Sequence, residues 1–185
     1  LHLGSLIAIL FYFNKELLNI PNDKRLFNLL LIGSIPLILV GYIFYSTGMI
    51  NSFRNLETIA WTTLVFGILM YFSDTFKVKK NIEKDLSIKN ILIIGILQIF
   101  AIIPGVSRAG ITITAGRFLN FDRHDSAKIS FYLSIPALIG ASVLSLKDAI
   151  SEDLEFNFLL IISIILSFIF SYLTIKYFLI YTKKF

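Results

Sequence analysis

The sequence predicts an all-α integral membrane protein, a polytopic helical bundle with one re-entrant helical hairpin around residues 91–119. Two observations predict the class. Of the 185 residues, 56% are hydrophobic and only 16% are charged, whereas soluble domains are typically about 45–50% apolar and about 25% charged. The basic residues also gather in short segments between long apolar runs. A water-soluble enzyme of this composition would have too little polar surface to cover itself.

The apolar runs have the length that a membrane-spanning helix requires, about 20 residues with a range of about 17–25. We expect four spans and, before them, the end of a further span. The spans are predicted at residues 26–45, 56–72, 129–146 and 156–181, and the partial span at residues 3–13. Together they predict a single transmembrane domain over residues 1–185, which we expect to be truncated at both ends.

The distribution of Lys and Arg predicts how the spans are oriented. Segments 14–25, 73–90 and 117–128 carry eleven of the basic residues, while segments 46–55 and 147–155 carry one each. Basic connections stay on the cytoplasmic side of a membrane. The basic segments are therefore predicted to be cytoplasmic and the other two external, in a multi-pass membrane protein.

The apolar segment 91–119 is too short to form two membrane spans. Both of its ends lie next to basic segments, so it must enter and leave on the same side within 29 residues, whereas two full spans need about 40. We therefore predict a re-entrant hairpin, broken at Pro104–Gly110. Non-helical backbone at membrane depth is tolerated only where protein buries it or water reaches it. The break should therefore line a polar cavity.

The residues of the break suit an anion. Pro104 ends the incoming half-helix, and Gly105 and Gly110 allow backbone conformations that other residues avoid. We expect the returning half-helix to begin near residues 109–112, so that its unpaired N–H groups and the positive end of its dipole face the cavity.

Three side chains complete this predicted phosphate-binding site. Ser107 supplies a hydroxyl, Arg108 supplies a planar set of donors suited to phosphate oxygens, and Thr112 lies one turn into the helix. The alternative is that the break is only a kink and that Arg108 extends to the membrane interface. Because an arginine within a membrane is rare and costly, we favour the anion site.

These residues also carry a family resemblance. The segment PGVSRAGITI (104–113), preceded by Gln98 and Ala101, closely resembles the PGxSRSGxTI motif of the undecaprenyl-pyrophosphate phosphatases, the bacitracin-resistance family. Residues 1–13, 32–41 and 127–142 are similar to further blocks of that family, in the same order. The resemblance implies an enzyme of the bacterial plasma membrane that removes the terminal phosphate of undecaprenyl diphosphate and so recycles the lipid carrier of cell-wall synthesis. It also implies inverted repeats, with two re-entrant hairpins meeting at an active site open to the outer face.

Carried over by motif, the resemblance implies that Arg108 and Ser107 are catalytic and that Gly105, Gly110 and Thr112 bind substrate. The chain departs from the family at Ala109, where a second serine is usual. The family's glutamate-rich motif, with its catalytic glutamates and histidine, would lie upstream of residue 1, and a further helix would follow residue 185. We expect a divalent cation, Mg or Ca, whose ligands lie outside this segment.

The expected partners are a polyprenyl diphosphate lipid and the bilayer, with a homodimer as a further candidate and no nucleic acid. The competing functions are a transporter or lipid translocator with a re-entrant anion site, for which broken helices are a common device, and a non-catalytic remnant. The upstream acidic motif separates these from the enzyme, since hydrolysis needs it and transport does not.

The remaining polar residues are assigned structural roles. With no cysteine and two distant histidines, His2 and His124, the sequence predicts no metal cluster, and both histidines are interpreted as non-functional. Arg117 is interpreted as an orientation signal, with the cavity as its alternative. Gln98 is expected to hold helices together or to contact substrate. Residues 122–125 are expected to cap the helix that follows, through Asp122 and Asp125.

Overall fold

The computed structural model describes residues 2–19, 24–151 and 158–184. Over these residues the secondary structure is helical and no strand forms. The elements are α1 (His2–Tyr12), α2 (Asn14–Asn19), α3 (Lys24–Ser46), η1 (Met49–Phe53), α4 (Leu56–Asp74), α5 (Ile82–Asp85), α6 (Ile88–Gln98), η2 (Ile99–Ile102), α7 (Arg108–Phe118), α8 (Arg123–Ser151) and α9 (Phe158–Lys184).

The all-α membrane class is confirmed. Four helices in the described part of the chain are long and apolar enough to cross a membrane, over Arg25–Ser46, Leu56–Asp74, Arg123–Ser145 and Leu160–Lys184. They correspond to the four predicted spans. The predicted connections 14–25 and 147–155 lie partly outside the described residues, as do positions 156 and 157 of the last predicted span.

The predicted start of the third span, residue 129, is six residues too late. Helix α8 begins at Arg123, because Asp122 Oδ1 accepts a hydrogen bond from the backbone N–H of Asp125 at 2.6 Å. A carboxylate at this position caps the first turn of a helix. The polar segment ahead of the apolar run is therefore already helical, and a search for apolar residues alone misses it.

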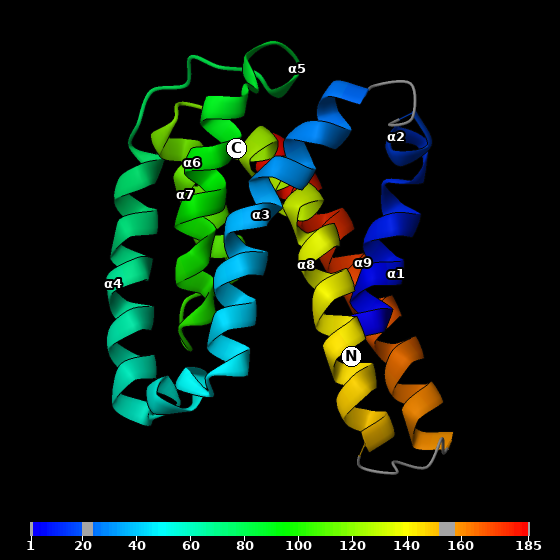
Figure 1. Ribbon diagram of the computed structural model, residues 1–185. Helices are drawn as coiled ribbons and strands as arrows, with labels where there is room; N and C mark the ends of the chain where they lie inside the picture. The colour runs from blue at the N-terminus through cyan, green and yellow to red at the C-terminus, as the bar shows by residue number, and fades with distance from the viewer. Residues whose placement is uncertain (1, 20–23, 152–157, 185) are drawn as a thin grey trace.

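The helices form two groups that meet at α7 and α8 (Figure 1). Helices α3, α4, α6 and α7 pack together on one side, while α1, α8 and α9 pack together on the other, and α8 also contacts α3. Helices α2 and α5 lie at the same end of the molecule, called here the basic end, and the α3–α4 connection lies at the opposite end. The basic segments around α2 and α5 thus lie at one end, as the prediction requires. Which end faces the cytoplasm stays a prediction.

Helices α6 and α7 form a hairpin that enters from the basic end and returns to it (Figure 1). Its tip rests on α4, where Thr62 Oγ1 donates to the Pro104 carbonyl at 2.7 Å and Thr63 Oγ1 donates to the Gly105 carbonyl at 3.2 Å. Along α4, Thr62 lies about 18 Å from Asp74 at the basic end. The hairpin therefore follows roughly two-thirds of α4 and turns back. Its depth in a bilayer, and the inverted repeat, stay predictions.

Two glycines allow the hairpin to pack this closely. Gly105 has a φ of +91°, and a Cβ there would lie 2.2 Å from Thr62 Oγ1, so the tip requires glycine. A Cβ on Gly95 of α6 would lie 2.1 Å from the carbonyl oxygen of Gly33 in α3. Small residues at such crossings let the backbones of membrane helices approach each other.

Burial is concentrated at the junction of the two groups. Ala115, Phe121, Ala127, Ile129 and Leu133, from α7, α8 and the turn between them, are fully buried. Large apolar side chains on α3, α4 and α9 are exposed instead. In a membrane these outer faces contact lipid, which is as apolar as they are.

Candidate functional site

The returning half of the hairpin starts at Arg108, earlier than the predicted 109–112. Ser107 is its N-cap, and its Oγ accepts a hydrogen bond from the Gly110 N–H at 3.1 Å. The non-helical break is therefore residues 103–107, shorter than the predicted Pro104–Gly110. The correction follows from local capping, since a serine hydroxyl can pair with an N–H of the first turn. Arg108 and Ala109 become the first two residues of α7, whose N–H groups have no acceptor within the helix.

A cavity of about 550 Å³ lies beside this helix start, between α1, α7, α8 and α9. Helix α7 contributes Arg108 and Ala109 to its wall. Of the segment Pro104–Gly110, which was predicted to line a polar cavity, only these two residues do so, and the non-helical residues 103–107 do not belong to the lining. The other walls carry hydroxyl groups and apolar side chains. The lining residues from the other three helices are His2, Ser5, Ile9, Ser130, Phe131, Ala137, Leu138, Ala141, Phe170, Ser171, Thr174 and Ile175.

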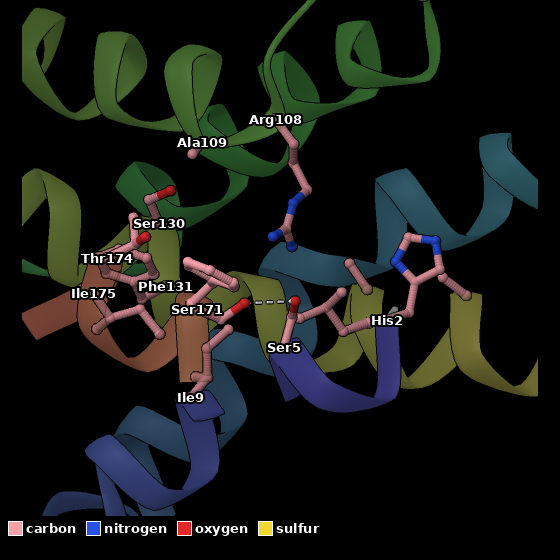
Figure 2. A pocket seen from close by; sticks show the side chains of 14 residues that line it. His2, Ser5, Ile9, Arg108, Ala109, Ser130, Phe131, Ser171, Thr174 and Ile175 are labelled. Carbon is pink, nitrogen blue, oxygen red and sulfur yellow. Dashed lines mark hydrogen bonds between the residues drawn. The ribbon is translucent and has the colours of Figure 1, made fainter. Parts of the chain in front are cut away.

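The guanidinium of Arg108 extends from α7 into this cavity, toward the first turns of α1 (Figure 2). Its Nη1 atom is buried and has no hydrogen-bond partner among the described residues. No carboxylate belongs to the described lining. A buried charge without a partner is unfavourable, and an anion bound in the cavity would supply that partner. The placement therefore favours the anion site over the alternative in which Arg108 extends to the membrane interface.

Hydroxyl groups surround the space that Arg108 enters. Ser5 of α1 and Ser171 of α9 lie 2.8 Å apart, oxygen to oxygen (Figure 2). Ser130 of α8 and Thr174 of α9 also line the cavity. Hydroxyls both donate and accept hydrogen bonds. The cavity thus combines one permanent positive charge with neutral donors, which is the chemistry that a phosphate group requires.

The other residues assigned by the motif do not line the cavity. Gly105 lies against α4, and Gly110 and Ser107 pair with each other in the first turn of α7. Thr112 is buried, and its Oγ1, which lies 2.9 Å from the Arg108 carbonyl oxygen, donates to Ser130 Oγ at 2.7 Å. In this structure the four residues hold the start of α7 in place. Their contact with substrate stays a prediction.

Sequence reasoning missed the contribution of α1. His2, interpreted as non-functional, and Ser5 both line the cavity. With Ile9 they have the spacing i, i+3, i+7, which places them on one face of a helix. That spacing was the available signal. It shows that the residues share a face, but not that the face turns toward Arg108.

Arg117 lies at the other end of α7 and does not belong to the cavity lining. It is buried, and its Nη2 donates to the carbonyls of Asp74 at 2.9 Å and of Phe76 at 3.0 Å. Its Nε forms an ion pair with Asp74 Oδ1 at 3.3 Å, and Arg123 pairs with the same carboxylate. Arg117 therefore fixes the end of α4 to α7. The interpretation as an orientation signal alone is incomplete.

Two further structural assignments are tested by the contacts. Asp122 caps α8 as predicted, whereas Asp125 accepts from the Ile82 N–H at 2.8 Å and so ties α5 to α8.

Gln98 is fully buried, and its amide has no partner among the described residues. Gln98 does not line the cavity.

The described residues do not fit a divalent cation. They include no group of three or more His, Cys, Asp or Glu side chains placed to hold a metal ion. The cavity wall provides one imidazole and several hydroxyls, whereas Mg²⁺ and Ca²⁺ prefer carboxylate and carbonyl oxygens. The expected cation stays a prediction, and no step below depends on it.

Comparisons with known proteins all identify the same family. The family model described as "Bacitracin resistance protein BacA" matches residues 1–185. An undecaprenyl-diphosphatase of Pelagibacter ubique (strain HTCC1062) is 58% identical over 186 residues, covering 100% of this chain and 73% of the relative. Undecaprenyl-diphosphatases of Elusimicrobium minutum (strain Pei191) and Halothermothrix orenii (strain H 168 / OCM 544 / DSM 9562) are 40% and 38% identical, each over 100% of this chain and 73% of the relative.

Proposed function

Because the chain belongs to the bacitracin resistance protein BacA family, we propose that it hydrolyses undecaprenyl diphosphate to undecaprenyl phosphate and phosphate. A relative that is 58% identical to it over 186 aligned residues is named for this activity. The reaction suits a multi-pass membrane protein, because the isoprenoid tail of the substrate can stay in the lipid while its head group enters the protein. The activity would recycle the lipid carrier of cell-wall synthesis.

The observation that carries the proposal is the guanidinium of Arg108 in the cavity, whose buried Nη1 has no hydrogen-bond partner in the described part of the chain. A diphosphate head group brings several negatively charged oxygens. The planar guanidinium can pair with two of them at once. The N–H groups of Arg108 and Ala109 at the start of α7 add donors and a favourable dipole on the same side.

In the reaction, a new bond forms between the terminal phosphorus and an attacking oxygen, and the bond to the bridging oxygen breaks. With water as the attacking group, one proton passes from that water to the phosphate products. Negative charge on the transferring phosphoryl group must be stabilised throughout. Electrostatic stabilisation of this kind is the main source of catalysis in phosphoryl transfer, and an arginine in this role is worth about 10³–10⁵ in rate.

We further propose that the α6–α7 hairpin enters the bilayer from the cytoplasmic side and returns to it. Its two ends lie at the basic end of the molecule, and its tip reaches Thr62 of α4. Membrane-embedded breaks of this type are stable where the protein buries them or where they line an aqueous cavity. Arg108 follows directly after such a break.

Phosphate release from undecaprenyl diphosphate by the full-length protein in detergent tests the proposal. We expect Arg108→Ala to lower kcat/KM by about 10³-fold or more. Arg108→Lys should restore only part of the loss, because a lysine offers a point charge without the planar pair of donors. Arg54→Ala is the matched control, because Arg54 is exposed and does not line the cavity.

Two outcomes would contradict the proposal. Activity of Arg108→Ala within tenfold of the wild type would remove Arg108 from the reaction. Movement of the lipid across vesicle membranes without phosphate release would favour the translocator instead.

A further inference from the structure

The cavity has a second basic side chain, on the helix that faces α7. His2 lies in the first turn of α1 and lines the cavity together with Ser5 and Ile9. In Figure 2 the Arg108 side chain descends from α7 toward the α1 turn that carries Ser5 and His2. The two basic groups therefore approach the same space from different helices, far apart in the sequence.

The position of α1 is fixed by close packing on α9. A Cβ on Gly4 would lie 2.5 Å from the Ile164 carbonyl oxygen and 2.7 Å from Ser167 Cβ, so the two backbones are in contact there. Ser5 Oγ adds hydrogen-bond contacts to Ser171 at 2.8 Å and to Ser167 at 3.3 Å. Gly4 and Ser5 therefore fix the first turn of α1 beside the cavity, and this turn carries the exposed side chain of His2.

The chemistry of the wall favours an anion between the two basic groups. In the described lining, Arg108 and His2 are the only side chains that can carry positive charge, and none can carry negative charge. One guanidinium can pair with two oxygens of a phosphate group, which leaves further oxygens to be satisfied. Imidazole carries an N–H donor in both of its protonation states.

We propose that His2 binds the phosphate head group of the substrate through an imidazole N–H, from the wall opposite Arg108. This inference rests on the proposed function, since it adds a residue to the same site. The motif around Arg108 does not include it, because His2 belongs to α1. The site is thus built by two chain segments more than 100 residues apart.

The test combines turnover with a binding measurement that does not need turnover. Full-length protein and its His2→Ala and His2→Gln variants are compared for kcat, KM and the dissociation constant of inorganic pyrophosphate. A hydrogen bond to a charged group supports about a tenfold effect on affinity or more. We expect His2→Ala to raise KM and weaken pyrophosphate binding by about tenfold, with a smaller change in kcat.

His2→Gln and His124→Ala are the controls. Glutamine keeps an N–H donor of similar reach, so His2→Gln should recover most of the lost affinity. His124 lies at the start of α8, outside the cavity lining, and its replacement should leave pyrophosphate binding unchanged.

Each remaining outcome is decisive. Wild-type pyrophosphate affinity in His2→Ala would overturn the inference while the proposed hydrolysis stands. Equal losses in His2→Ala and His2→Gln would show that the ring only supports α1, and would also overturn it. If His2→Ala weakens pyrophosphate binding and His2→Gln restores it, but the wild type releases no phosphate from undecaprenyl diphosphate, the inference stands and the proposed function fails.

Discussion

The crossing of α3 and α6 offers the sharpest test of how the hairpin is held. A Cβ added to Gly95 would lie 2.1 Å from the Gly33 carbonyl oxygen, 3.0 Å from its carbonyl carbon and 3.2 Å from its Cα. Carbon and oxygen atoms normally approach to about 3.3–3.6 Å. Gly95→Ala therefore requires the two backbones to separate by roughly 1 Å at this point. No change of rotamer can relieve the contact, because all three neighbouring atoms are backbone.

The expected cost follows from these distances. Overpacking a closely packed site costs about 1–3 kcal/mol, and a clash between two backbones belongs at the upper end of that range. Alanine recovers up to about 1 kcal/mol over glycine in a helix interior. The net destabilisation is therefore about 2 kcal/mol, which corresponds to a fall in Tm of roughly 4–8 °C for a chain of this size.

Thermal unfolding of the purified protein in detergent measures this effect. Gly41→Ala is the matched control, because Gly41 lies in α3 and its added Cβ would meet no atom within 4 Å. We expect Gly41→Ala to leave the Tm unchanged or slightly raised. If Gly95→Ala has no lower Tm than Gly41→Ala, the close approach of α3 and α6 is wrong.

Two further predictions concern the ends of α7. Thr112→Val should lower the free energy of unfolding by about 1 kcal/mol, because it removes the hydrogen bond to Ser130, and Thr112→Ser should retain most of it. The same variants test the motif-derived role, since a tenfold rise in KM for valine but not for serine would show that the hydroxyl also contacts substrate. Asp74→Asn should cost about 1–2 kcal/mol in chemical denaturation, because the buried Arg117 loses its ion pair. An unchanged denaturation midpoint would contradict that role.

The fold class and the spans follow from local properties of the sequence. A helix of about 20 apolar residues satisfies its own backbone hydrogen bonds in lipid, so composition and length predict the spans without knowledge of the neighbouring helices. The break before Arg108 was predicted for the same reason, because Pro104 and Gly105 act on the backbone where they stand. The errors are at helix starts: α7, capped by Ser107, begins at Arg108 and not within 109–112, and α8, capped by Asp122, begins six residues before the apolar run.

The candidate site shows the same distinction between properties of one segment and contacts between helices. The sequence by itself determined that Arg108 follows a break in an apolar segment and carries a charge that needs a partner. Only the tertiary structure decided which side chains share its cavity. The spacing of His2 and Ser5 fixes their common helical face, but the direction of that face depends on how α1 packs against α9. Likewise, Thr112 turns to Ser130 because α7 packs against α8. Contacts between helices depend on the packing of whole faces, which no single segment contains.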